Sequence, residues 1–183
     1  MHSLGFFSQI SIVVEEGWAM RLVCFRLMLY SFGGWLLEGL YQLLMTGSFW
    51  KPNFLLGPFK PMYGIASVLL LAVRPLGKRA FFFFAQLIPL GVEFVSAWWL
   101  KAAFGLQYWD YSAYKYNVAG FICLQFAVFW VVLSYAFAYF LQPKLAKIKF
   151  TERKVTKGAV RFLWAGFLRD IFYTIIKAWG GWK

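Results

Sequence analysis

Two glutamates stand within strongly apolar stretches, where a charged side chain is hardest to explain by packing. Glu38 lies in LVCFRLMLYSFGGWLLEGLYQLLM and Glu93 lies in AFFFFAQLIPLGVEFVSAWWLKAAF. A carboxylate near the centre of a membrane costs roughly 2.5–3.5 kcal/mol on insertion scales and normally faces the interior of a helix bundle. We expect the two acids to face each other there, either as a site for a cation or proton, or as structural acids that are ion-paired or bonded to loop amides. Each shares a helical face with small or polar residues: Ser31, Gly34 and Gln42 on the first stretch, and Gln86, Pro89 and Ser96 on the second.

Two aromatic, turn-rich segments follow the acid-bearing stretches. NFLLGPFKPMYG carries glycine and two prolines, which prevent a regular helix. YWDYSAYKYN surrounds an aspartate with tyrosines, and aromatic rings at this depth typically anchor a membrane interface. Asp110 and Asn117 are also suited to closing turns and to capping the next helix. Besides the two glutamates, the candidate residues of an interior polar site or ligand-facing vestibule are Tyr41, Tyr63, Trp109, Asp110, Tyr111, Ser112 and Asn117.

The composition indicates what kind of protein must hold these residues. Of 183 residues, 62% are hydrophobic, 23% are aromatic and only 14% are charged, whereas a soluble domain is about half apolar and a quarter charged. His2 is the only histidine and no GxxxxGK[ST] motif occurs, so histidine catalysis and ATP binding by a P-loop are excluded. Cys24 and Cys123 lie in apolar runs and are expected to be buried thiols. We expect no cofactor and no metal.

Four apolar stretches predict an all-α, polytopic membrane helix bundle with four transmembrane spans. They cover residues 22–45, 61–73, 80–104 and 117–141. A span needs about 20 helical residues, so the second stretch is short: either residues 54–59 dip into the membrane, or neighbouring helices shelter it. The matching positions of Glu38 and Glu93, and of Gly64 and Gly120, indicate two parallel-type repeats. A ridge of small residues on the fourth stretch is expected to pack against another helix: Gly120, Cys123, Ala127, Ser134 and Ala138.

The basic residues are unevenly distributed between the two sides of this arrangement. The chain has 19 Lys and Arg against 7 Asp and Glu, a net charge of +12. Cytoplasmic flanks of membrane proteins collect Lys and Arg. Twelve of these residues fall on one side, so we expect a protein of the cytoplasmic membrane with both termini in the cytoplasm and no nucleic-acid partner. Four fall on the other side: Lys51, Lys60, Lys101 and Lys115.

The region after residue 142 differs from the bundle, so we divide the chain into 1–142 and 143–183. KLAKIKFTERKVTKGAVR is basic, and FLWAGFLRDIFYTIIKAWGGW is apolar but interrupted by Arg169, Asp170 and Lys177. This pattern predicts a basic amphipathic helix on the inner membrane surface that binds anionic lipid. A fifth span is the alternative.

Several motifs, in order, resemble a bacterial family of putative ABC-transporter type IV membrane proteins, the CmpB-like permeases. FGGWLLEGLYQLLMTGSF, FLLGPFKPMYG, and WDYS followed by KYNVAGFICLQF are similar to the family's G-W-x-x-E-x-x-Y, L-x-G-P-x-x-P-I-Y-G, W-W-D-Y-S and N-x-x-G-x-I-C-L-x-F-S. The likeness covers roughly residues 32–130. Lys51, Pro52 and Asn53 stand where the family has Asn-Arg-Gly. The resemblance implies transport, with an ATPase supplied by a separate subunit.

Together these features predict a permease-like membrane subunit in which Glu38 and Glu93 line an interior polar site that opens outward between the two loops. We favour a protein without enzymatic activity. One alternative is a membrane enzyme acting on lipid-linked substrates, with Glu38, Glu93 and Asp110 as acid and base groups. Another is a scaffold or regulator whose carboxylates only brace the loops. A homo-oligomer stays open.

Overall fold

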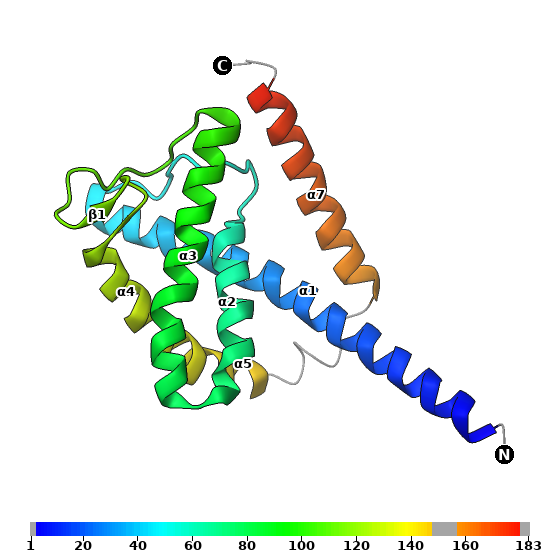
Figure 1. Ribbon diagram of the computed structural model, residues 1–183. Coiled ribbons are helices and arrows are strands. Elements are labelled where there is room, and N and C mark those ends of the chain that lie inside the picture. Colours follow the sequence, from blue (N-terminus) through cyan, green and yellow to red (C-terminus); the bar gives the residue numbers. More distant parts are fainter. Residues whose placement is uncertain (1–2, 148–156, 180–183) are drawn as a thin grey trace.

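The computed structural model describes residues 3–147 and 157–179, and its regular structure is almost entirely helical (Figure 1). Residues 148–156, in the expected basic stretch, lie outside the described residues. The elements in chain order are α1 (Ser3–Thr46), α2 (Pro61–Val73), the 3-10 turn η1 (Arg74–Leu76), α3 (Lys78–Phe104), β1 (Asn117–Val118), β2 (Ile122–Cys123), α4 (Leu124–Tyr135), the π-helical segment η2 (Ala136–Leu141), α5 (Gln142–Lys147) and α7 (Lys157–Trp179).

Three of the described helical segments are long and apolar enough to cross a membrane. They are Met20–Thr46, Lys78–Phe104 and Leu124–Ala146, the last running through α4, η2 and α5. At 1.5 Å per residue, a helix of 27 residues reaches about 40 Å, more than the roughly 30 Å of a hydrocarbon core. The apolar helix Pro61–Leu76 is shorter. The predicted all-α polytopic bundle is therefore confirmed, with a short second helix.

The short second helix begins beside Ser31 of α1. The Lys60 amide donates to the Ser31 carbonyl at 3.0 Å, and Pro61 then occupies the first turn of α2, a position where its missing N–H costs nothing. Gly64 lies so close to α1 that a β-carbon would overlap the Leu27 carbonyl oxygen and the Ser31 hydroxyl. The end of the loop 47–60 thus returns to Ser31, which lies near the middle of the segment Met20–Thr46.

The fourth helix begins later than predicted. Residues 117–123 form a small antiparallel pair in which Val118 faces Ile122, and α4 starts only at Leu124. The turn between the strands holds Ala119 at φ 54° and Gly120 at φ +71°, a left-handed conformation that ends regular structure. Gly120 and Cys123 therefore do not belong to a small-residue ridge on this helix, and that part of the prediction is wrong.

Two buried clusters hold the helices together. The first joins α1, α2, α3 and η2 through Tyr30, Leu70, Phe81, Ala85, Phe137 and Ala138. The second joins α1, the loop 47–60 and α7 through Met28, Leu55 and Phe167. Figure 1 shows the C-terminal end of α7, in red, at the same end of the molecule as the C-terminal end of α3 and the loop 47–60. Among the described helices, α7 is not one of the three that are long and apolar enough to cross a membrane, and its placement on the inner surface or as a fifth span stays a prediction. The side of the membrane on which each terminus lies stays a prediction.

Candidate functional site

Glu38 is held by two lysines from the loop that follows its helix. Lys51 Nζ lies 2.6 Å from Oε1 and Lys60 Nζ lies 2.6 Å from Oε2. The side chains of Glu38 and Lys60 are only 16% and 11% exposed, and that of Lys51 is 29% exposed. Short contacts between ionised groups are stronger than neutral hydrogen bonds. The loop 47–60 is therefore fastened to α1 at Glu38, and both carboxylate oxygens are occupied.

Burial disfavours the charged form of Lys60. Removal of its ammonium group from water lowers the pKa of Lys60, and the nearby charge of Lys51 lowers it further. The Glu38 carboxylate opposes both effects through its charge and its hydrogen bond. The ion pair with Glu38 therefore offsets part of what burial costs the charged form of Lys60.

Glu93 is more deeply buried and has neutral partners. Only 3% of the residue is exposed. Its Oε1 accepts a hydrogen bond from the Tyr111 hydroxyl at 3.0 Å, and its Oε2 accepts one from Trp130 Nε1 at 2.7 Å. Burial raises the pKa of Tyr111, and the charge of Glu93 raises it further, so the tyrosine keeps the proton that it donates. The Tyr111 hydroxyl and the Trp130 indole thus stabilise Glu93 as neutral dipoles. At Glu38 two ammonium groups have this role.

Tyr63 connects the two acids. The charges of Glu38 and Glu93 both act on the Tyr63 hydroxyl. Its side chain lies directly against Gly34, where a β-carbon would overlap the ring, and its ring centroid is 5.2 Å from that of Trp130. The structure therefore brings the two glutamates into one region of the interior, as expected, but gives each acid its own partners.

The other candidate residues of the second loop mostly shape the loop itself. Asp110 Oδ1 accepts the Ser112 amide at 2.9 Å, and Asn117 donates to the Tyr114 carbonyl at 2.8 Å and accepts from the Gly120 amide at 3.1 Å. The prediction that Asp110 and Asn117 close turns is correct. The prediction that they cap the fourth helix is wrong, because Cys123 precedes that helix and no side-chain cap is present there.

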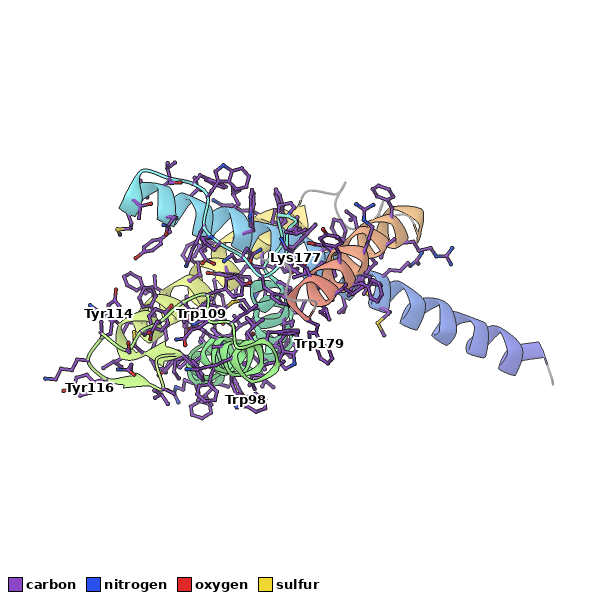
Figure 2. All side chains as sticks on the ribbon, turned by 90° about the horizontal axis from the view of Figure 1, so that it is seen from above. Trp98, Trp109, Tyr114, Tyr116, Lys177 and Trp179 are labelled. Atoms are coloured by element: carbon purple, nitrogen blue, oxygen red, sulfur yellow. The ribbon has the colours of Figure 1, made fainter. Side chains whose placement is uncertain are left out.

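Among the described residues, neither Trp109 nor Tyr41 has a glutamate as a hydrogen-bond partner: Trp109 binds the strand pair and Tyr41 is exposed. The Trp109 indole donates to the Phe121 carbonyl at 3.0 Å, which ties the loop to the strand pair. Figure 2, viewed from above, shows Trp109 nearer the helices, whereas Tyr114 and Tyr116 lie toward the outer edge of the loop. Tyr41 is exposed on α1. Among the predicted loop residues, Tyr111 is the one whose side chain contacts a glutamate.

A cavity of about 140 Å³ lies between the two loops. Its wall includes Asn53 and Lys60 from the first loop, Ser96 from α3, and Tyr108 and Trp109 from the second loop. Partial burial raises the pKa of Tyr108. Among the described residues that line it, Lys60 is the one that touches a glutamate. The opening between the loops thus reaches the carboxylate region through Lys60.

A third carboxylate, on α7, holds the same loop from the other side. Asp170 Oδ1 accepts the Leu56 amide at 3.1 Å and Oδ2 accepts the Gly57 amide at 2.8 Å. A β-carbon on Gly57 would lie 2.8 Å from Oδ2, so only glycine allows this approach. The rings of Phe59 and Phe167 pack edge to face at 5.8 Å. The loop 47–60 thus obtains acceptors for two of its backbone amides from α7.

Sequence reasoning missed Lys51, Lys60, Trp130 and Asp170 as partners in this region. Asp170 carried a readable signal, because it is an acid inside an apolar stretch, as are the two glutamates. From the sequence alone, we treat Lys51 and Lys60 only as charges on the outer side and do not pair them with Glu38. Lys51 stands in the segment where the chain departs from the motif Asn-Arg-Gly. The basic residue in this segment is ion-paired with Glu38.

Comparison with known proteins gives one match. No curated protein matches the chain. No solved structure matches it. A family model described as "Putative ABC-transporter type IV" matches residues 25–175, which include α1 from residue 25 onward, both loops, α2, α3, α4 and most of α7. The chain therefore belongs to the ABC-transporter type IV family, as its motifs indicated.

Proposed function

We propose that this protein is a permease-like membrane subunit of a transport system, in which Glu93 is the residue that responds to a cation or proton. Membership of the family and the three long apolar helices support a transport-related membrane protein. The sequence has no P-loop motif, so the ATPase of such a system is a separate subunit. Solute enters from the cavity between the loops, past Lys60.

The observation that carries the proposal is the setting of Glu93. It is a buried acid in a segment long enough to span a membrane, and the two donors that contact it are neutral. An ionisable residue at that depth is typically functional. Glu38 differs, because both of its oxygens are already bound to ammonium groups.

The two donors on Glu93 suit both of its protonation states. A tyrosine hydroxyl can donate to a carboxylate or accept from a carboxylic acid, whereas an indole N–H can only donate. On protonation of Oε1, the Tyr111 contact reverses direction while Trp130 stays on Oε2. Both contacts to Glu93 therefore persist when the site gains a proton, and the Tyr111 O–H then turns away from Oε1.

A second candidate function, a scaffold or regulator, is favoured by the Glu38 group and by Asp170. Both bind the loop 47–60 and neither leaves a carboxylate oxygen free of a partner. The cavity between the loops favours the permease. For the enzyme alternative, Glu38 is poorly suited to acid–base chemistry because its oxygens are ion-paired.

Solute uptake tests the proposal. Membrane vesicles would be prepared from cells producing the wild-type chain with any ATP-binding subunit that co-purifies, and their accumulation of a broad solute mixture compared with that of vesicles lacking the chain. We expect at least one solute to accumulate only with the chain, and Glu93→Gln to abolish this accumulation without loss of folded protein. Asp110→Asn is the matched control, since it keeps the oxygen that closes the turn.

Two results would overturn the proposal. One is a set of vesicles in which no solute distinguishes the chain from its absence. The other is full accumulation by Glu93→Gln. In the second case the protein transports, but Glu93 is not the responding group.

A further inference from the structure

A second, larger groove lies among the helices themselves. Its volume is about 240 Å³. Its wall is almost entirely apolar and is built by α1, α2, α3, α4 and η2, with Gly33, Tyr63, Pro89, Trp130, Ser134 and Phe137 among the lining residues. Leu37 and Leu141, which also line it, are exposed side chains on segments long enough to span a membrane. The groove therefore reaches the surface at a level where the surrounding medium is lipid hydrocarbon.

Local irregularities of the helices make this space. Pro89 interrupts the hydrogen-bond ladder inside α3. The π-helical segment η2 adds a residue to a turn, a feature often found at functional sites. Gly33 leaves a gap on α1, because a β-carbon there would meet nothing within 4 Å. Three elements thus contribute to one groove, although each is otherwise a regular apolar helix.

The size of the groove decides what can occupy it. An α-helix with side chains is about 10 Å across and rises 1.5 Å per residue, so a helix from another chain would place only about two residues in the volume. Apolar cavities of roughly 150 Å³ stay free of water. A single hydrocarbon chain fits the small volume and the apolar wall of the groove.

One polar group in the wall lacks a partner. Ser134 is buried, and among the described residues its hydroxyl makes no hydrogen bond. Such a group costs free energy unless something pairs with it.

We propose that the groove lined by Gly33, Tyr63, Trp130 and Ser134 is a binding site for one acyl chain of a membrane phospholipid. The chain would lie against Trp130, whose indole holds Glu93, so an occupied groove supports the carboxylate region from the lipid side. The site does not depend on transport: it would exist in a permease, a scaffold or an enzyme alike.

Photolabelling tests the site directly. The full chain is reconstituted in phosphatidylcholine vesicles that contain a small fraction of phosphatidylcholine with a diazirine on one acyl chain, and labelled residues are mapped by mass spectrometry. We expect labelling to saturate with probe and to concentrate on Leu37, Leu133 and Phe137, which line the groove. Val95, an exposed residue outside the lining, should label weakly and without saturation.

Gly33→Leu adds a side chain at the groove wall, and its β-carbon would meet nothing within 4 Å. We expect loss of the saturable labelling of the lining residues, because the leucine takes up space that the acyl chain would occupy. Gly91→Leu is the matched control, because Gly91 is also an exposed helical glycine with nothing within 4 Å of an added β-carbon and does not line the groove. Its labelling should equal that of the wild type, and both variants should unfold at or above the wild-type temperature.

Equal labelling of the wild type, Gly33→Leu and Gly91→Leu would overturn the proposal and leave only general lipid contact. A bifunctional crosslink that joins two copies of the chain through Leu37 or Leu141 would also overturn it, since the occupant would then be protein. Ser134→Ala gives an independent measurement. It keeps the groove open and apolar, so labelling by the acyl chain should persist. Loss of labelling without loss of folded protein would contradict an occupant that is held by apolar contacts.

Discussion

The two halves of the bundle stabilise a buried acid in opposite ways. In the first half, Glu38 is compensated by the charges of two lysines on the following loop. In the second half, Glu93 is compensated by the dipoles of Tyr111 and Trp130. The two acids that the sequence pairs by position therefore have different electrostatics. An ion-paired acid such as Glu38 keeps one charge state, whereas an acid among neutral donors, such as Glu93, can change its charge. We therefore assign a structural role to Glu38 and a responsive role to Glu93.

The largest effect is expected at Glu38. Glu38→Gln leaves two buried or half-buried ammonium groups facing each other without an anion, and breaking a buried pair by removal of one partner typically costs several kcal/mol. We expect the free energy of unfolding to fall by about 3 kcal/mol, measured by thermal or denaturant unfolding in detergent. Lys60→Met in the same chain should recover most of the loss. A change below about 1 kcal/mol would place Glu38 with exposed ion pairs and remove the contrast.

A smaller loss is expected from the loop of the second half. Tyr111→Phe keeps the ring, which stacks on Phe126 at 4.7 Å, and removes the hydroxyl that donates to Glu93. Hydrogen bonds to charged groups contribute about 1.5–3 kcal/mol, and Trp130 still holds the second oxygen, so we expect a loss near 1.5 kcal/mol. Tyr114→Phe is a suitable control, because Tyr114 is an exposed neighbour in the same ring cluster. Equal effects of the two variants would show that ring packing, and not the bond to Glu93, stabilises this loop.

Substitution of Glu93 itself is expected to change stability least among these variants. A glutamine keeps a carbonyl oxygen for Trp130 and offers an amide to the Tyr111 oxygen, while a buried charge is removed. We expect Glu93→Gln to stay within about 1 kcal/mol of the wild type. Direct comparison with Glu38→Gln sharpens the contrast between the halves. Similar destabilisation by both substitutions would mean that the two acids have the same role.

Tyr111 should not lose its proton between pH 9 and 11, the range in which an ordinary tyrosine ionises. Because burial and the Glu93 charge raise its pKa above the usual 10.0, Tyr111 keeps its proton while that of an unfolded tyrosine is lost. Its raised folded-state pKa therefore contributes stability below about pH 10 that is lost as the pH rises through the folded pKa. Absorbance at 295 nm between pH 9 and 11 should be the same for the wild type and Tyr111→Phe. A deficit of one phenolate in the variant would contradict the buried hydrogen bond.

The sequence predicted the class of fold and the interior position of the two acids, because both follow from local signals. Apolar runs of helical length and an acid in such a run need no knowledge of distant residues. The partners could not be predicted in the same way. Lys60 reaches Glu38 only because the loop returns to Ser31, and nothing in the spacing of residues 47–60 specifies that return. The late start of α4 was hidden as well, since Tyr116 and Ala119 adopt positive φ without being glycine.

The contact of Asp170 with the loop 47–60 also sets an order of events during synthesis. The two amides that it accepts lie 114 and 113 residues earlier in the chain. At roughly 5–20 residues per second, the ribosome adds Asp170 about 6–23 seconds after those amides. Throughout that interval the loop has entered or approached the membrane with two backbone donors that its own half of the bundle does not satisfy. The loop 47–60 therefore obtains these two acceptors only once α7 has been made, so the first half of the bundle is completed by a helix that follows the second half.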